Sequence, residues 1–371
     1  MGLLTTMLRK VVDEGASDLY LSTGRAPAMR IQGRLVTQKG APLTRQDTET
    51  LALQLMTSAQ YKQFKDDPEM NLSYNVEGIG RFRFNIFRQK REIAMVIRAI
   101  PHKVPKLDEL GVPPILRDVV MLKRGLVLVV GSTGTGKSTT LASLMDHRNH
   151  HHASHIITLE DPIEYLLEHD KSVVNQREIG TDTRSYAQAL KNALRQSPDV
   201  LMIGEIRDQV AMEHALMFSD TGHLCLATLH ANNSSQAFER MINLFPAAKR
   251  EQLMLSLSLN IRAVVSQQLV PTIDGKRSAV FEILLSTPRV TDLIRRGAFD
   301  ELAVTIEKGA SVGMQTLDQS LYELHQSGVI AAETALEYAS SYRDMRLRMR
   351  FDTAAHTAAT TTGNNMEMTV Q

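Results

Sequence analysis

The chain has 371 residues, of which 43% are hydrophobic and 22% charged, a balance typical of a soluble globular protein rather than a disordered or fibrous one. Its formal net charge of +1 provides no global field that would recruit nucleic acid, so we expect no nucleic-acid partner. The length is sufficient for two or three domains with cores of their own.

The sequence offers no means of crossing a membrane. No apolar stretch reaches the ~18 residues of a transmembrane helix, and residues 1–9 lack the apolar core of a signal peptide. Any membrane association is therefore expected to be peripheral or through a partner. The single cysteine, Cys225, lies in an apolar run and is expected to be a buried core thiol, which suits the cytoplasm.

The first part of the chain predicts a small α+β domain over residues 1–101. Apolar residues at helical spacing predict a short helix between residues 5 and 14, and helical patterning recurs between 47 and 65. Alternating patterns predict strands at residues 18–22, 29–33 and 81–87. Four prolines then mark residues 102–122 as a linker that contains a short helix.

From residue 123 the pattern changes to strands that alternate with helices, which predicts an α/β domain with a parallel sheet over residues 123–287. An amphipathic helix is expected from residue 186 to 194, and the expected strands are residues 126–130, 155–159, 200–203 and 224–229. Residues 288–350 are predicted to be helical. Residues 351–371, rich in Thr and Ala, are predicted to be disordered.

A phosphate-binding loop follows the first of these strands. The pattern G-x-x-x-x-G-K-S stands between an apolar strand and an opening helix, the setting that a P-loop requires. Glycines permit the turn, backbone N–H groups converge on the phosphates, and the helix N-terminus favours their negative charge. Lys137 is expected to reach the β- and γ-phosphates, and Ser138 to ligate Mg²⁺. The predicted nucleotide contacts are Gly131, Ser132, Thr133, Gly134, Thr135, Gly136, Lys137, Ser138 and Thr139.

Carboxylates follow two other strands. Glu160, Asp161 and Glu164 come after the strand at 155–159, and Glu205 ends an apolar strand in the layout of a Walker B element, with Glu where Asp is commoner. Open α/β sheets bind ligands at the carboxyl ends of their strands. One such carboxylate can hold the hydration shell of Mg²⁺, and another can accept a proton from the attacking water.

Five histidines lie within nine residues, at 147, 150, 151, 152 and 155. They follow the helix after the P-loop, where cationic side chains suit the helix dipole. Because no ligand spacing with cysteine or carboxylate accompanies them, we interpret them as a solvated helix end rather than a metal site.

Taken together, these motifs resemble the secretion ATPase superfamily and, within it, the PilT/PilU retraction motors of type IV pili. The segment Thr158-Leu-Glu-Asp-Pro-Ile-Glu164 is similar to the acidic box, Gly204-Glu-Ile-Arg-Asp208 to the atypical Walker B, and the segment from Thr221-Gly-His223 to Thr228-Leu-His230 to the histidine box. Further motifs, including Gly15-Ala-Ser-Asp-Leu-Tyr-Leu-Ser22, extend the resemblance to about residue 340.

The resemblance implies a homohexameric ring in which an N-terminal PAS-like domain and a C-terminal RecA-like domain bind ATP and Mg²⁺ between them. It further implies an ATPase that powers pilus retraction and twitching motility, located in the cytoplasm at the inner-membrane face of the pilus base. The implied partners are a PilT-like retraction ATPase and the inner-membrane platform protein.

By the same resemblance, Glu164 is the water-activating base, Glu205 the Walker B acid that holds Mg²⁺ directly or through water, and His230 a sensor of the nucleotide. His223 and His230 are seven positions apart, so on one regular strand they would face opposite sides, and His230 is the better candidate. Arg81 and Arg98 are candidates for contacts with phosphates across the domain interface. The alternative for such arginines is a solvated sheet face.

Two departures favour a PilU-like identity. Retraction motors of the PilT kind carry an Ala-Ile-Arg-Asn-Leu-Ile-Arg-Glu box, of which Arg289-Val-Thr-Asp-Leu-Ile-Arg-Arg296 keeps only part. The arginine-rich C-terminal extension is also more similar to PilU. A solvated helix end and a docking segment for an acidic partner both remain open for these arginines.

Three other functions compete with a retraction motor. A pilus-extension or type II secretion ATPase usually carries paired zinc-binding cysteines, which one cysteine cannot supply. A non-autonomous regulatory ring would bind nucleotide yet need a PilT-like partner to act. A P-loop kinase would need a phosphate-acceptor site, whereas the acidic and histidine boxes favour hydrolysis.

Overall fold

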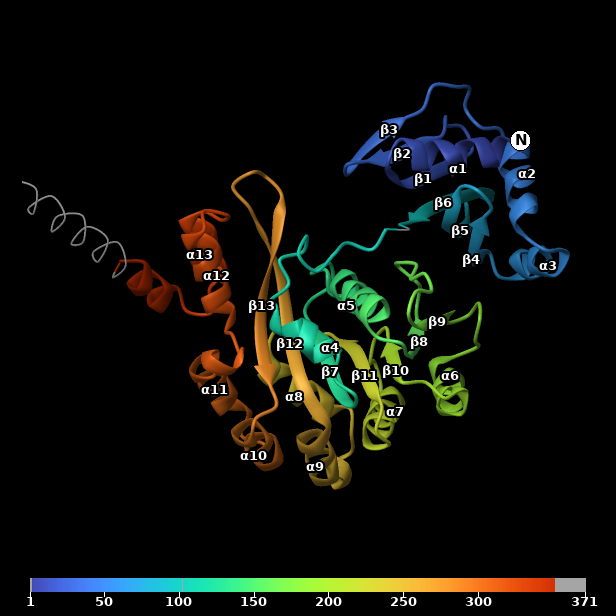
Figure 1. Cartoon of the computed structure of the whole chain (residues 1–371). Coiled ribbons are helices and arrows are strands. Elements are labelled where there is room, and N and C mark those ends of the chain that lie inside the picture. The colour runs from blue at the N-terminus through green and yellow to red at the C-terminus, as the bar shows by residue number, and fades with distance from the viewer. Residues whose placement is uncertain (1, 102, 351–371) are drawn as a thin grey trace, which may run out of the picture. The chain divides into compact units, whose positions relative to one another are not determined.

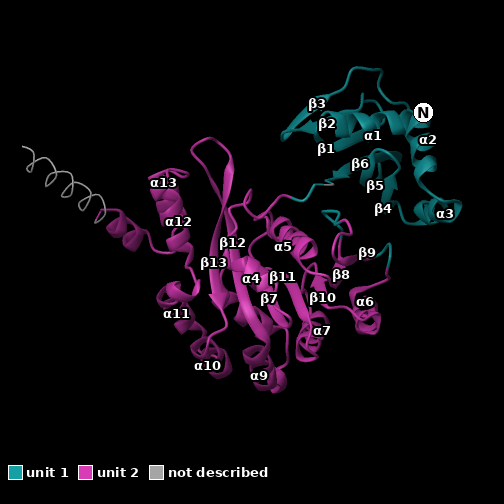
Figure 2. Cartoon of the chain, viewed as in Figure 1, with its two compact units in different colours: residues 1–104, 162–167, 180–182 teal, residues 105–161, 168–179, 183–371 magenta. Residues whose placement is uncertain are grey.

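A computed structural model describes residues 2–101 and 103–350. The chain divides into two compact units (Figure 2). Unit 1 comprises residues 1–104, 162–167 and 180–182, and unit 2 comprises residues 105–161, 168–179 and 183–371. The predicted disordered tail at 351–371 lies outside the described residues.

Unit 1 is built on an antiparallel sheet (Figure 1). In its described part, six strands follow the order β3-β2-β1-β6-β5-β4. Helices α2 and α3 each begin with a capping box, at Thr44 and Thr57, which satisfies the unpaired N–H groups of the first turn. The elements are α1 Leu3–Asp13, β1 Ala16–Ser22, β2 Ala28–Ile31, β3 Arg34–Thr37, α2 Arg45–Leu55, α3 Ser58–Asp66, β4 Glu69–Val76, β5 Gly80–Gln89 and β6 Glu92–Ile100.

The sheet of unit 1 has one apolar and one polar face. On β5, Phe82, Phe84 and Ile86 are fully buried in the core of the unit, and the intervening Arg81 and Arg83 are half-buried on the other face. This alternation is the period of two that a strand imposes on its side chains. The polar face is therefore free to carry charged groups.

Unit 2 contains a mixed sheet in the order β13-β12-β7-β11-β10-β8-β9, counted over its described residues. Strands β7 to β12 pair in parallel, and β13 closes the edge as an antiparallel partner of β12. The strands are β7 Gly125–Val130, β8 His155–Glu160, β9 Val173–Glu178, β10 Val200–Ile203, β11 Leu224–Leu229, β12 Ile261–Pro271 and β13 Arg277–Leu285. The α/β class with a parallel sheet is thus confirmed, whereas β9, β12 and β13 were not among the predicted strands.

Helices cover the sheet of unit 2 on both faces (Figure 1). Leu126, Leu128 and Val130 of β7 join the core formed with α6 to α11, and Val127 and Val129 point to the opposite face, where α5 lies. The helices are α4 Ile115–Val120, α5 Lys137–His151, α6 Tyr186–Ala193, α7 Gln209–Asp220, α8 Ser234–Asn243, α9 Arg250–Asn260, α10 Pro288–Arg296, α11 Leu302–Lys308, α12 Leu317–Gln326 and α13 Ala332–Tyr338, with 3₁₀ turns at Leu194–Gln196, Ala247–Lys249, Phe299–Glu301 and Ala310–Val312. Residues 342–350 are also helical.

The boundary between the units differs from the predicted linker. Unit 2 already starts at residue 105, because Leu116, Val119 and Val120 of α4 are buried there. Conversely, residues 162–167, which contain the end of the acidic box, belong to unit 1.

Over the described residues, the helices are too short or too polar to cross a membrane.

Candidate nucleotide site

The P-loop joins the carboxyl end of β7 to α5 in unit 2. Gly134 and Gly136 adopt left-handed conformations, with φ of 80° and 86°, which glycine reaches without strain. A Cβ atom on Gly131 would lie 2.5 Å from both the Gln267 carbonyl oxygen and Thr135 Oγ1. The loop therefore keeps its backbone exposed and close to its neighbours, as a phosphate cradle requires.

Polar contacts within the loop hold its shape. Lys137 Nζ donates to the carbonyl oxygens of Gly131 and Ser132 at 2.8 and 2.7 Å, and Thr135 Oγ1 donates to Ser132 O at 2.9 Å. Lys137 is buried, whereas Ser138, in the first turn of α5, is exposed. The lysine ammonium thus lies inside the curve of the loop, and the serine hydroxyl is open to a ligand.

A glutamine from β12 supports the loop from the neighbouring strand. Gln267 is 2% exposed and donates from Nε2 to the carbonyl oxygen of Thr135 at 2.8 Å. Its Oε1 atom is buried and accepts no hydrogen bond from the described residues. Gln267 is therefore held between the loop and the core, with one half of its amide unsatisfied.

The Walker B carboxylate lies in a charged cluster at the ends of β10 and β11. Glu205 Oε1 is 2.8 Å from His230 Nε2, and Glu205 Oε2 accepts from Arg207 Nε at 2.6 Å. Arg207 Nη1 also approaches Asp161 Oδ2 at 3.5 Å. The hydrogen bond to Glu205 raises the pKa of the Arg207 guanidinium. Both Glu205 oxygens are thus held by cationic or imidazole groups.

Backbone bonds fix this cluster to the sheet. Gly204 N donates to Leu159 O at 2.7 Å, Thr228 Oγ1 donates to Gly204 O, and Ile206 N donates to Thr228 O at 2.9 Å. The segment after β10 is consequently tied to both β8 and β11. Glu205 and His230 meet because their strands are neighbours in the parallel sheet.

Glu164 lies in unit 1, where it lines a pocket of about 310 Å³ together with Ser17, Arg83 and Arg98. Arg83 and Arg98 are direct cross-strand partners on β5 and β6. The pocket therefore combines a carboxylate with two guanidinium groups. Arg81 is on the same face of β5, two positions from Arg83, but it does not line this pocket.

Asp18 orients one of these arginines. Its side chain is 5% exposed and accepts from Arg98 Nε at 2.8 Å, while Arg30 Nε is 3.9 Å from its other oxygen. Asp18 pairs with Arg30 on one side and with Arg98 on the other, so the three residues form a row across β2, β1 and β6. Such a row fixes where the Arg98 guanidinium points.

Comparisons with known proteins identify the family of the chain. The family model of the Type II/IV secretion system protein matches residues 1–366. The chain belongs to this family. It is 47% identical to the type IV pilus ATPase PilU of Pseudomonas aeruginosa, over 98% of this chain and 96% of the relative. It is 40% identical to the retraction ATPase PilT of the same organism, over 91% and 98% of the two chains.

A solved structure of the pilus retraction motor PilT with bound ADP superposes on this fold with a TM-score of 0.86, at 38% identity, over 93% of this chain and 98% of that one. The predicted membership in the PilT/PilU group is therefore confirmed, and the protein is a PilT/PilU-like type IV pilus ATPase with a nucleotide-binding fold.

In this pilus ATPase, several contacts of the site were not singled out from the sequence. Gln267 was not predicted, and Asp18 was named only as part of the motif at residues 15–22, because their bonds join segments that are distant in the sequence. Asn232, whose Oδ1 accepts a hydrogen bond from Ser132 Oγ at 2.9 Å, was also not predicted as a site residue. Arg207 was predicted only as part of the Walker B motif, although its spacing of two residues from Glu205 could have indicated their ion pair.

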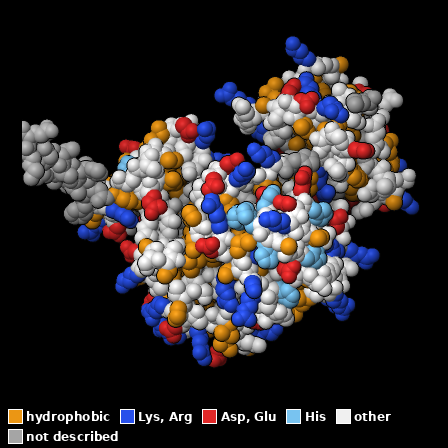
Figure 3. All heavy atoms as spheres, viewed as in Figure 1, with side chains coloured by type: hydrophobic (Ala, Val, Ile, Leu, Met, Phe, Trp, Pro, Cys, Tyr) orange, Lys and Arg blue, Asp and Glu red, His pale blue; other side chains and the backbone are white. Residues whose placement is uncertain are grey.

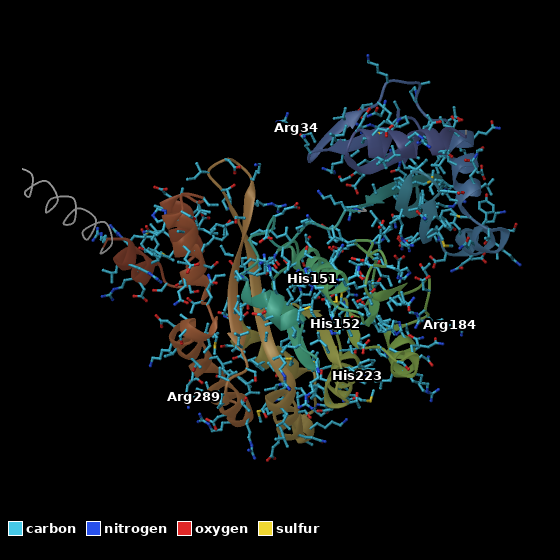
Figure 4. The ribbon with its side chains drawn as sticks, viewed as in Figure 1. Arg34, His151, His152, Arg184, His223 and Arg289 are labelled. Carbon is cyan, nitrogen blue, oxygen red and sulfur yellow. The ribbon has the colours of Figure 1, made fainter. Side chains whose placement is uncertain are left out.

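The histidines at the end of α5 gather on one face of unit 2 of this pilus ATPase (Figure 3). His150 approaches Asp146 at 3.5 Å and Asp170 at 3.6 Å, and His147 stacks on His151 with 4.1 Å between ring centroids. Among residues 2–101 and 103–350, no group of three or more metal-ligating side chains could hold a metal ion. His151 and His152 are labelled in Figure 4.

His223 lies directly before β11, at the opposite end of that strand from His230 (Figure 4). Its Nδ1 lies 3.0 Å from Thr221 Oγ1 and 3.3 Å from the carbonyl oxygen of Phe218. The two histidines of the predicted histidine box thus have different surroundings. Only His230 is in contact with Glu205.

The partial retraction box occupies α10 and is engaged in ion pairs on the surface (Figure 4 labels Arg289). Arg289 pairs with Glu301 and lies 3.7 Å from Asp292, while Arg296 pairs with Asp292 at 2.9 Å. Two arginines of this segment therefore bind acids of the same chain.

Proposed function

We propose that the protein is an ATP-hydrolysing, Mg²⁺-dependent hexameric motor that powers type IV pilus retraction, in the PilU-like manner that depends on a PilT-like partner. The observation that carries the proposal is the P-loop, whose buried Lys137 and glycine-built cradle stand on the same sheet as the Glu205 and His230 pair. The similarity to the pilus ATPases PilU and PilT supports the proposal.

The residues of the P-loop fit a nucleotide and its metal. Lys137, now bonded to loop carbonyls, would exchange these for the β- and γ-phosphate oxygens. The exposed Ser138 hydroxyl and the Glu205 carboxylate are oxygen donors of the kind that Mg²⁺ prefers, the latter directly or through water. Mg²⁺ so held would neutralise charge on the phosphates.

In this proposal, Glu164 accepts the proton of the attacking water, and Arg98 and Arg81 neutralise charge that develops on the γ-phosphate. The pocket shared by Glu164 and Arg98 supports the pairing of base and cation. His230 senses the nucleotide through Glu205, since it contacts that carboxylate.

The assembly and the location belong to the same proposal. We place the hexamer at the cytoplasmic face of the inner membrane, with the pilus platform protein and a PilT-like ATPase as partners. Similarity to PilU and the incomplete retraction box of α10 support the dependence on a partner.

The proposal is tested by nucleotide binding and turnover in three variants. Lys137→Ala should abolish binding and hydrolysis, because it removes the phosphate cation. Glu164→Gln and Glu205→Gln should bind ATP yet turn over at least ~100-fold more slowly, as expected when a general base or metal-holding acid is lost. Normal turnover in either glutamine variant would refute the role of that residue.

A further inference from the structure

A polar pocket of about 570 Å³ lies beside the P-loop in unit 2. Ser132 and Thr133 line it from the loop, His230 and Asn232 from the segment after β11, and Glu239 and Arg240 from α8. The roles proposed above use the loop and His230, but they leave the α8 side of the pocket without a function.

The pocket is joined to the P-loop by hydrogen bonds. Ser132 Oγ donates to Asn232 Oδ1 at 2.9 Å, and the backbone N–H of Asn232 donates to Gln236 Oε1 at 3.2 Å. The early part of the loop is therefore linked to α8. Because Ser132 and Thr133 of the loop line the pocket together with His230, the pocket adjoins the phosphate site on its His230 side.

Arg240 supplies the pocket with an available cation. Its side chain is exposed and makes no ion pair or side-chain hydrogen bond with residues 2–101 or 103–350. By contrast, Arg207, which follows β10 at this end of the sheet, is already bound to Glu205. A guanidinium with all its N–H groups free is well suited to a phosphate-sized anion.

We propose that this pocket receives the inorganic phosphate released by ATP hydrolysis, with Arg240 as its main cation. The inference rests on the proposed ATPase function. Hydrolysis breaks the bond between the γ-phosphorus and the oxygen it shares with ADP, and that oxygen leaves with the electron pair of the bond. The water oxygen joins the phosphorus, and the proton that the water loses passes to Glu164. The freed phosphate is then a separate anion, which needs a path away from the loop while ADP is still bound.

Glu239, next to Arg240, is expected to lower the affinity of the pocket for phosphate. Glu239 lines the same pocket and repels a dianion, so the pocket holds phosphate weakly and releases it. Glu239 and Arg240 are both exposed residues of α8, so replacing either should leave the fold intact. These two residues therefore form a matched pair with opposite expected effects.

The test is calorimetric titration of inorganic phosphate into the full chain saturated with ADP and Mg²⁺. Arg240→Gln should weaken phosphate binding about tenfold, since charge-assisted bonds to the guanidinium are lost. Glu239→Gln should strengthen it severalfold. Arg9→Gln, an equal change of charge at an exposed position of α1, should leave it unchanged.

The outcomes separate this inference from the proposed function. Phosphate binding that follows the predicted order supports the phosphate pocket even if the protein alone hydrolyses no ATP, a result that would contradict the proposed ATPase function and not the pocket. An equal affinity for phosphate in Arg240→Gln, Glu239→Gln and the unmodified chain would refute the proposed role of the pocket, even if ATP turnover is normal. Absence of phosphate binding to the unmodified ADP-loaded chain would also overturn it.

Discussion

Gln267 offers the sharpest test of how the fold shapes the P-loop. Replacing it by methionine keeps the length and bulk of the side chain but removes both amide atoms. Two effects on stability then oppose each other. Loss of the bond from Nε2 to Thr135 O costs about 0.5–1.5 kcal/mol, whereas removal of the buried, unsatisfied Oε1 returns about 1–3 kcal/mol.

The free energy of unfolding of Gln267→Met should consequently lie within about 1 kcal/mol of the unmodified protein or slightly above it. Gln267→Ala, the matched control, also leaves a cavity next to β7, so it should lose about 2–3 kcal/mol. Urea denaturation followed by circular dichroism measures both values.

Nucleotide affinity should respond differently from stability. Without the bond to Thr135, the loop is free to sample other shapes, so we expect the affinity of Gln267→Met for a fluorescent ADP analogue to fall about fivefold to tenfold, or about 1–1.4 kcal/mol. A loss of more than ~2 kcal/mol of stability in the methionine variant would show that Oε1 is satisfied. Unchanged ADP affinity would show that Gln267 does not set the shape of the loop.

Three further predictions follow from the described contacts. Cys225 is fully buried and burial raises the pKa of its thiol, so iodoacetamide should modify it only in denaturant, as mass spectrometry would show; rapid labelling of the native protein would contradict its burial. Asp18→Asn should lower the unfolding free energy by about 1–2 kcal/mol in urea denaturation, because the buried carboxylate loses its charge opposite the partly exposed Arg98. A double-mutant cycle of Glu205→Gln and His230→Ala should give a coupling of about 1 kcal/mol in thermal unfolding, and additive effects would mean that the observed contact contributes nothing.

The sequence predicts this fold best where a local pattern determines the structure. The run at 126–130 had to be a buried strand because all its residues are apolar, and the glycines after it had to form a turn. Likewise, the alternation of arginine and phenylalanine along β5 predicted its two faces correctly.

Long-range pairings could not be predicted in this way. Strands β12 and β13 are antiparallel to each other, and β12 joins the parallel sheet beside β7, far away in the sequence. Gln267 therefore lies under the P-loop for a reason that no local pattern contains. The charge pair of Asp18 and Arg98 depends on strand neighbours that are 80 positions apart.

The central claim is tested most directly by steady-state ATP hydrolysis of the purified protein alone, in the presence of Mg²⁺, while its assembly state is followed by light scattering. The account predicts turnover by a hexamer, reduced at least ~100-fold by Glu205→Gln. Nucleotide binding and ring assembly without any turnover would contradict it and would favour a regulatory ring that acts only through a partner ATPase.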